Sequence, residues 1–195
     1  MPLQIKTVSN TEVQALIDLW LQCFPEDDPA YPREFLQLID LSSAAIVGFV
    51  DEKPVTMLFL APATARLGER TYRVRYLYAG CTHPSYRRHG YYEELMLQAF
   101  EKVKSWGEDA IYLYPAEKSL FAYYKRLGYR AGITCAAPTE NSFWWDLDEP
   151  IREFFSATQE GSAARGECLW IPVREDNALA KSMLNNVAYT YLVGN

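Results

Sequence analysis

Residues Tyr76 to Met96 read YLYAGCTHPSYRRHGYYEELM and hold the most informative pattern of the chain. A β-prone segment ends in a basic, glycine-containing turn that leads directly into an amphipathic helix. The first turn of a helix has N–H groups without intrahelical partners and a partial positive charge, so it attracts phosphate oxygens. Gly90 lets a ligand approach the backbone closely, and Arg87 and Arg88 offer charged planar groups suited to a diphosphate. This order of parts predicts a phosphate-binding turn.

The segment after the turn has helical periodicity. Its apolar residues recur at spacings of three and four and so share one face: Tyr92, Leu95, Met96, Ala99, Phe100 and Val103. Gly107 stands where the glycine of a helix C-cap is expected. The pattern therefore predicts a helix that begins after Gly90 and ends before Gly107.

The basic turn is similar to a motif of a known family. Residues Pro84 to Tyr92, PSYRRHGYY, resemble the pyrophosphate-binding motif of the GNAT superfamily of acyl-CoA-dependent N-acetyltransferases. That motif reads Arg/Gln-x-x-Gly-x-Gly/Ala after a Pro-x-x turn. Arg87 and Gly90 match its first two fixed positions, whereas Tyr92 replaces the small third residue.

A second segment resembles the other characteristic motif of the same family. Ala110 to Tyr114 predict a short strand, and Ala116 to Gly128 predict a helix. The helix ends in Tyr123 to Tyr129, YYKRLGY, where the family has Phe/Tyr-Tyr-x-x-x-Gly-Phe/Tyr. Two motifs in the family's order and separation are much more specific than either motif alone.

The resemblance implies an α/β fold with a mixed sheet, and an N-acetyltransferase that uses acetyl-CoA as co-substrate and needs no metal. It implies direct attack by a primary amine of a small molecule or peptide in a ternary complex. Three strand-end residues would pair with the pantetheine arm through their backbone: Gly80, Cys81 and Thr82. The pyrophosphate would be wrapped by six residues: Arg87, Arg88, His89, Gly90, Tyr91 and Tyr92. The Tyr92 side chain is expected to turn toward the core.

Tyr124 matches the family position whose phenol acts as general acid toward the CoA thiolate. A phenol with its ordinary pKa near ~10 is protonated at neutral pH, and a thiolate with a pKa near ~8.5 is a plausible acceptor. Aromatic residues at helical spacing are also typical of a core, and Tyr123 is the neighbouring alternative.

The sequence does not indicate a general base. Many family members have a Glu on the central strand, where this chain has Tyr76 and Tyr78. His83 fits a surface turn, and Glu117 fits the start of a helix. A covalent acyl-enzyme on Cys81 has little support, because no His–Asp pair lies at a recognisable spacing.

Residues 1–147 are predicted to form the GNAT domain, and residues 148–195 a C-terminal extension that is not an independent domain. Ser9 and Glu12 form a capping-box signature for a first helix that ends near Pro25. The acidic loop that follows, residues 26–28, is either a solvated connector or an attractor for a cationic amine.

Further elements follow from the local patterns. Residues 51–54 predict a hairpin turn between two strands. Toward the C-terminus the predicted elements are a last domain strand at 142–147, a helix at 150–159, a flexible joint at 161–166, and a strand, a helix and a strand at 167–173, 177–184 and 187–193.

Composition narrows the class of protein. The chain has 195 residues, a net charge of −6 and 49% hydrophobic residues, which suits one globular domain and argues against non-specific nucleic-acid binding. Its four cysteines have no CxxC or metal-ligand spacing and are expected to be reduced. With no apolar leader or membrane-spanning run, we expect a cytoplasmic protein. Trp144, Trp145 and Trp170 leave room for a homodimer interface.

Two other functions remain open at the level of sequence. A non-catalytic acyl-CoA sensor or interaction module would account for the missing strand Glu and for Tyr92. Modification of a charged tRNA, as in toxin-type relatives, is disfavoured by the acidic balance of the chain.

Overall fold

The structure is a computed structural model that describes residues 2–67, 69–134, 143–157 and 167–174. The chain divides into two compact units. Unit 1 contains the residues up to Ala61 together with Leu77–Glu101, and unit 2 contains Pro62–Tyr76 and the residues from Lys102 onward. The chain combines helices with a sheet that has both parallel and antiparallel strand pairs, which confirms the predicted α/β class.

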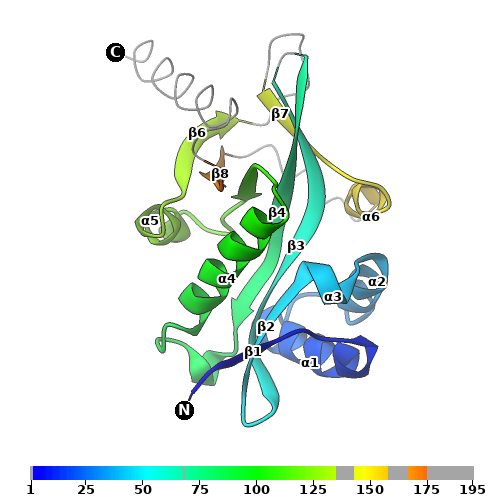
Figure 1. The fold of residues 1–195 in the computed structure, drawn as a ribbon. Helices are drawn as coiled ribbons and strands as arrows, with labels where there is room; N and C mark the ends of the chain where they lie inside the picture. The colour runs from blue at the N-terminus through cyan, green and yellow to red at the C-terminus, as the bar shows by residue number, and fades with distance from the viewer. Residues whose placement is uncertain (1, 68, 135–142, 158–166, 175–195) are drawn as a thin grey trace. The chain divides into compact units, whose positions relative to one another are not determined.

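Unit 1 is built on antiparallel strands, with β2 between β1 and β3 (Figure 1). The elements of this part are β1 (Gln4–Lys6), η1 (Asn10–Glu12), α1 (Val13–Cys23), α2 (Ala30–Leu38), α3 (Leu41–Ala44), β2 (Ala45–Val50) and β3 (Lys53–Leu67), of which β3 continues into unit 2. Asp51 and Glu52, with φ of 49° and 61°, form the predicted hairpin turn. The strand β3 begins within the predicted turn, at Lys53, and includes Pro54 and Pro62.

The predicted capping box is present at the start of η1, which leads directly into α1. The Glu12 carboxylate accepts a hydrogen bond from the backbone N–H of Ser9 at 2.9 Å, and the Ser9 hydroxyl caps the N-terminus in return. The hydrogen bond from the Ser9 hydroxyl, with smaller contributions from the Ser9 backbone and Thr11, lowers the pKa of Glu12 to about 2. The helix then ends at Cys23, close to the predicted Pro25.

Trp20 lies at the centre of an aromatic cluster in unit 1. Its ring is 5.6 Å from that of Phe35 and 5.9 Å from that of Phe59, and it is 1% exposed. Its indole N–H donates to Asp27 at 2.6 Å, while Asp28 accepts from the backbone N–H of Ala30 at the start of α2. Two of the three acidic loop residues are therefore occupied in positioning α1 and α2, which favours a structural role for this loop.

Unit 2 has the strand order β4-β5-β8-β6, and β7 pairs with β3 (Figure 1). The parallel pair is β4 with β5, in register at Val74 and Ala110. The elements are β4 (Arg70–Thr82), which continues into unit 1, then β5 (Ala110–Leu113), α5 (Ser119–Arg126), β6 (Arg130–Thr134), β7 (Phe143–Leu147), α6 (Ile151–Ala157) and β8 (Glu167–Pro172).

The strand β8 comes from the segment that the sequence assigns to an extension, yet it lies between β5 and β6. The last predicted domain strand, β7, is present and pairs antiparallel with β3 from Ala63 to Leu67. The domain boundary at residue 147 stays a prediction. The predicted joint at 161–166 and the predicted helix and strand at 177–193 lie outside the described residues.

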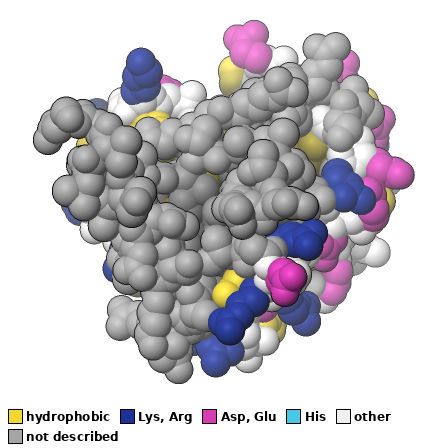
Figure 2. Space-filling model, turned by 90° about the horizontal axis from the view of Figure 1, so that it is seen from above, with side chains coloured by type: hydrophobic (Ala, Val, Ile, Leu, Met, Phe, Trp, Pro, Cys, Tyr) yellow, Lys and Arg dark blue, Asp and Glu magenta, His cyan; other side chains and the backbone are white. Residues whose placement is uncertain are grey.

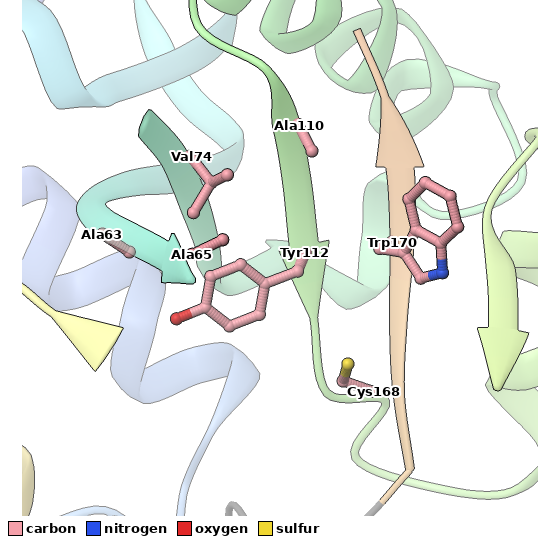
Figure 3. Close-up of a cluster of buried hydrophobic side chains, with 7 residues drawn as sticks. All are labelled: Ala63, Ala65, Val74, Ala110, Tyr112, Cys168 and Trp170. Carbon is pink, nitrogen blue, oxygen red and sulfur yellow. The ribbon is translucent and has the colours of Figure 1, made fainter. Parts of the chain in front are cut away.

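A cluster of buried side chains forms the core of unit 2 (Figure 3). Small residues on β3 and β5 leave space for the ring of Tyr112 on β5, and Trp170 lies on the neighbouring strand β8. The members of this cluster are Ala63, Ala65, Val74, Ala110, Tyr112, Cys168 and Trp170.

Since Trp170 is 0% exposed, the expectation that it contributes to a dimer interface is wrong. The side chains of Trp144 and Trp145 lie outside the described part.

Charged side chains of both signs lie beside one another on the face shown in Figure 2, in its described part. No helix among the described residues is long and apolar enough to cross a membrane.

Glu108 follows α4 (Tyr91–Ser105) and is the buried charge of unit 2, with 2% of its surface exposed. Both of its carboxylate oxygens accept hydrogen bonds from Arg75, each at 2.7 Å. The Arg75 guanidinium also lies 4.5 Å from the ring centre of Trp106. This bidentate pair attaches the loop after α4 to β4.

Replacing Glu108 by Gln is expected to lower the free energy of unfolding by about 3 kcal/mol, because Arg75 loses its charge partner in a buried site. Arg73 is the matched control, since its side chain is 79% exposed and lies 3.4 Å from the same carboxylate. We expect Arg73→Ala to cost less than about 1 kcal/mol. Urea unfolding followed by circular dichroism measures the free energy of unfolding of both variants. Equal losses of stability in the two variants would contradict this account.

Candidate functional site

The predicted phosphate turn connects β4 to α4 within unit 1 and contains a short helical turn, η2 (Pro84–Tyr86). Its entrance is attached to the sheet, because the backbone N–H of His83 donates to the carbonyl of Val55 at 2.8 Å. The His83 ring accepts a hydrogen bond at Nδ1 from the backbone N–H of Ser85, at 3.1 Å. His83 is therefore a turn residue, as the sequence predicts.

The second half of the turn has a backbone that favours glycine at two positions. Arg88 has φ of 68° and Gly90 has φ of 79°. A left-handed arginine costs roughly 1–2 kcal/mol, so the surrounding structure must hold it in place. His89 contributes to this, since its Nδ1 lies 2.9 Å from the carbonyl oxygen of Arg87 and therefore carries the hydrogen. The His89 ring also stacks on Tyr91.

The polar groups of the turn are available to a ligand. The side chains of Arg87, Arg88 and His89 are exposed. Within the described part of the chain, the backbone N–H groups of Arg88, His89 and Gly90 donate no hydrogen bond. Arg87 donates from Nε to the carbonyl of Thr82 at 3.2 Å, which orients its guanidinium beside the strand end. The turn in which the sequence predicts a diphosphate site thus has three N–H groups that donate to no described protein group and two exposed guanidinium groups.

Both tyrosines at the start of α4 pack their side chains against the protein. Tyr91 is 7% exposed and packs with Val50 and Val55, so its side chain belongs to the core of unit 1. Tyr92 is half-buried, and its phenol lies against Gly80 of β4. The predicted part of both residues in holding a pyrophosphate stays a prediction.

Gly80 is required by this contact. A Cβ built at Gly80 would lie 2.0 Å from the Tyr92 hydroxyl oxygen and 2.8 Å from the adjacent ring carbon. Ala79 just before it has φ of 47°, so the regular geometry of β4 is interrupted at this point. The large third residue of the turn motif is therefore accommodated by a glycine on the strand.

Thr56 of β3 is a site residue that sequence reasoning missed. Its side chain is 0% exposed, and its hydroxyl lies 2.9 Å from both the Cys81 carbonyl oxygen and the Thr82 hydroxyl. The signal in the sequence was a lone polar residue within the apolar run VTMLFLA of residues 55–61. Thr56 fixes the strand end that was predicted to pair with a pantetheine arm.

Cys81 is not suited to be an acylated nucleophile. Its thiol is buried, and burial raises the pKa of Cys81 well above the ordinary value of a thiol. Since the thiolate is the nucleophile, a buried and protonated thiol reacts slowly. This agrees with the low support that the sequence gave to a covalent mechanism.

Tyr124, the predicted general acid, lies on α5 in unit 2 and is 7% exposed. Its ring is 5.4 Å from that of Tyr123 and 5.7 Å from that of Tyr129. Burial raises the pKa of Tyr129 well above its ordinary value, so that phenol stays protonated. Glu117 accepts a hydrogen bond from the Ser119 hydroxyl at the start of α5, which agrees with its predicted place there. The structure does not test the predicted chemical role of Tyr124.

No group of three or more His, Cys, Asp or Glu side chains that could hold a metal ion occurs among the described residues. The turn itself offers backbone N–H groups and arginines, which suit phosphate oxygens.

Comparisons with known proteins identify the family. The family model described as "Acetyltransferase (GNAT) domain" matches residues 4–132. No curated protein matches the chain. Among solved structures, a GCN5-related N-acetyltransferase from Anabaena variabilis is 20% identical with a TM-score of 0.60, over 68% of this chain and 33% of that one.

Two shorter structures are matched over most of their length. A GNAT family N-acetyltransferase from Escherichia coli, in complex with CoA, is 16% identical with a TM-score of 0.57, over 74% of this chain and 81% of that one. An acetyltransferase of the GNAT family from Staphylococcus aureus is 14% identical with a TM-score of 0.59, over 89% and 100%. By contrast, this chain spans only about a third of the first structures that it matches. At these identities the likeness establishes the fold.

The contact between Gly80 and Tyr92 can be tested by a double-mutant cycle. Gly80→Ala is expected to lower the free energy of unfolding by about 1–3 kcal/mol, because the new Cβ forces the Tyr92 ring to move. In a Tyr92→Ala background the same change should cost less than about 0.5 kcal/mol. Chemical unfolding of the four proteins gives the coupling energy. An equal cost in both backgrounds would show that the ring does not constrain Gly80.

Proposed function

The chain belongs to the GNAT acetyltransferase family, and on this premise we propose that it transfers an acetyl group from acetyl-CoA to a primary amine. The acceptor is a small molecule or a peptide. The amine nitrogen attacks the thioester carbon directly, the carbon–sulfur bond breaks, and CoA leaves as a thiolate that takes up a proton. The nitrogen gives up a proton in turn, so the products are an amide and free CoA.

The observation that carries this proposal is the state of the turn between β4 and α4. The N–H groups of Arg88, His89 and Gly90 donate to no described protein group, and Arg87 is held by Thr82. Because the turn is already fixed by His83 and His89, little ordering is needed when a diphosphate binds. A site organised in this way suits the pyrophosphate of CoA.

The strand end supports the same assignment for the pantetheine arm. We assign Gly80, Cys81 and Thr82 to this role. The carbonyl of Cys81 already accepts from Thr56, and that of Thr82 accepts from Arg87. Each carbonyl oxygen has a second lone pair, so these bonds position the strand without closing it to an amide of the ligand. The thioester carbonyl would be polarised by a backbone N–H of this segment.

We propose Tyr124 as the acid that protonates the thiolate. A phenol with an ordinary pKa near ~10 holds its proton at neutral pH and can give it to a thiolate. The close packing of Tyr124 against Tyr123 and Tyr129 would hold the phenol in one orientation. No general base is assigned, and solvent can accept the proton of the amine.

Two observations favour a second candidate, a protein that binds acyl-CoA without turnover. Tyr124 is as buried as a core residue, and β4 has tyrosines where a base would lie. The two hypotheses differ in one measurement. The enzyme releases free thiol from acetyl-CoA with at least one amine of a broad panel, whereas the sensor is stabilised against heat by CoA and releases none.

Arg87→Ala is expected to weaken CoA binding by about 10-fold or more, because a charged hydrogen bond to the diphosphate is lost. Binding of pantetheine, which lacks the diphosphate, should be unaffected by the same change. Lys6→Ala is the control, since Lys6 is engaged with Glu52 at 2.6 Å elsewhere in unit 1. Calorimetric titration measures the affinity of both variants for CoA and that of Arg87→Ala for pantetheine. An unchanged affinity for CoA would remove the turn from the binding site.

Tyr124→Phe is expected to lower kcat by about 100-fold with little change in KM, because the phenyl ring keeps the packing and loses the acidic proton. Tyr123→Phe is the matched control and should retain most of the activity. Steady-state rates of thiol release at saturating amine give kcat and KM for both variants. If the two variants behave alike, Tyr124 is a packing residue.

A further inference from the structure

Two phenols from distant parts of the chain meet beside the aromatic cluster of unit 1. Tyr31 is the second residue of α2, and Tyr78 lies on β4. Their hydroxyl oxygens are 2.6 Å apart, and either phenol can be the donor of the hydrogen bond. Both tyrosines are half-buried, whereas Trp20 and Phe35 beside them are buried. The pair therefore places two hydroxyl groups at the edge of a set of buried rings.

The neighbouring rings and the start of α2 fix the geometry of the pair. The Tyr78 ring is 5.1 Å from that of Phe35 and 5.9 Å from that of Trp20. The Tyr31 ring is 6.1 Å from that of Trp20, and the backbone N–H of Tyr31 donates to the carbonyl of Asp28 at 2.9 Å. Phenylalanine at either position would make the same ring contacts, so packing alone does not account for the two hydroxyls.

Tyr78 lies close to the segment proposed for the pantetheine arm, two residues before Gly80. In a regular strand, residues 78 and 80 would share one face. Here Ala79 lies between them with φ of 47°, which interrupts the alternation. A Cβ at Gly80 would meet Tyr92 of α4, whereas the Tyr78 ring contacts α1 and α2. The strand therefore carries the proposed thioester segment and, on the side of α1 and α2, a phenol next to it.

We propose that Tyr78 and Tyr31 form a proton relay that takes a proton from the acceptor amine, an inference that rests on the proposed acetyl transfer. As the amine nitrogen bonds to the thioester carbon, one of its hydrogens passes as a proton to the Tyr78 oxygen. The hydroxyl proton of Tyr78 moves to the Tyr31 oxygen, and that of Tyr31 passes to water. The carbon–sulfur bond breaks with its electron pair on sulfur, and both phenols are neutral before and after the step.

A relay of two phenols avoids a difficulty that a single tyrosine would have. A neutral phenol is a weak base, and a free phenolate needs a pH near ~10. A phenol that gives its proton to a second oxygen while it accepts one carries no net charge, and a hydroxyl can donate and accept at once. The distance of 2.6 Å is within the range of such a transfer. Tyr78 is thus the catalytic group that touches the amine, and Tyr31 acts through it.

Phenylalanine variants test the relay, because they keep the rings and remove the hydroxyls. Thiol release from acetyl-CoA is measured with phenethylamine, spermidine, L-lysine amide and trialanine, and kcat is taken with the fastest of them. Tyr78→Phe is expected to lower kcat by about 100-fold and Tyr31→Phe by about 10-fold, with the KM for acetyl-CoA unchanged. The double variant should be as slow as Tyr78→Phe alone, because the two phenols act as a unit.

Tyr76→Phe is the matched control on the same strand. The Tyr76 ring stacks on Tyr112 in unit 2, with 5.0 Å between the ring centres, and has no part in the relay. This variant should retain most of its activity. Thermal unfolding of every variant establishes that it is folded before its kcat is compared with that of the wild type.

Tyr78→His separates proton transfer from support of the fold. An imidazole can accept a proton by itself, so this variant should be about 10-fold or more faster than Tyr78→Phe. Adding Tyr31→Phe to Tyr78→His should not lower kcat further, because the imidazole no longer needs the second phenol. A hydrogen bond that only holds α2 against β4 would not be replaced in this way.

Three results would overturn the relay. If Tyr78→Phe and Tyr31→Phe keep the kcat of the wild type, or if Tyr78→His is no faster than Tyr78→Phe, the relay is wrong and the proposed acetyl transfer stands. If the wild type binds CoA but releases thiol with none of the four amines, the proposed function fails, and the relay, which needs an attacking amine, fails with it.

Discussion

The turn between β4 and α4 depends on two histidines whose ring nitrogens are used on the protein itself. His83 accepts from the backbone of Ser85, and His89 donates to the carbonyl of Arg87. These bonds satisfy local polar groups and hold Arg88 in a left-handed conformation that it would not adopt alone. The N–H groups of Arg88, His89 and Gly90 donate to no described protein group. The diphosphate site that we propose is therefore built from the backbone, and the arginines would add charge to it.

The strand end next to this turn shows how a departure from a family motif can be tolerated. A bulky Tyr92 would obstruct the strand if Gly80 had a side chain. The pairing of a large residue on the helix with glycine on the strand keeps the two elements close. Thr56 then holds the same strand end from the other side through Cys81 and Thr82. The site is thus supported by packing and by hydrogen bonds that involve residues outside the motif.

Much of the fold followed from local patterns in the sequence. The capping box at Ser9, the turn at residues 51–52, and the helix that ends before Gly107 are decided by neighbouring residues, and all three are present. The family followed from two motifs, and the match over residues 4–132 agrees with them. What each of the adjacent residues Tyr91 and Tyr92 packs against depended on the residues that lay opposite them. Periodicity cannot decide those contacts.

By itself the sequence determined the order of elements and the chemistry of the turn, because caps, glycines and charged residues act over a few positions. Only the tertiary structure decided which distant residues meet. It placed β8 between β5 and β6, buried Trp170 in a core, and brought Thr56 of β3 to Cys81 and Thr82 of β4. Such contacts arise from the pairing of strands and the packing of helices on them, and no local pattern in the chain encodes a partner so far away.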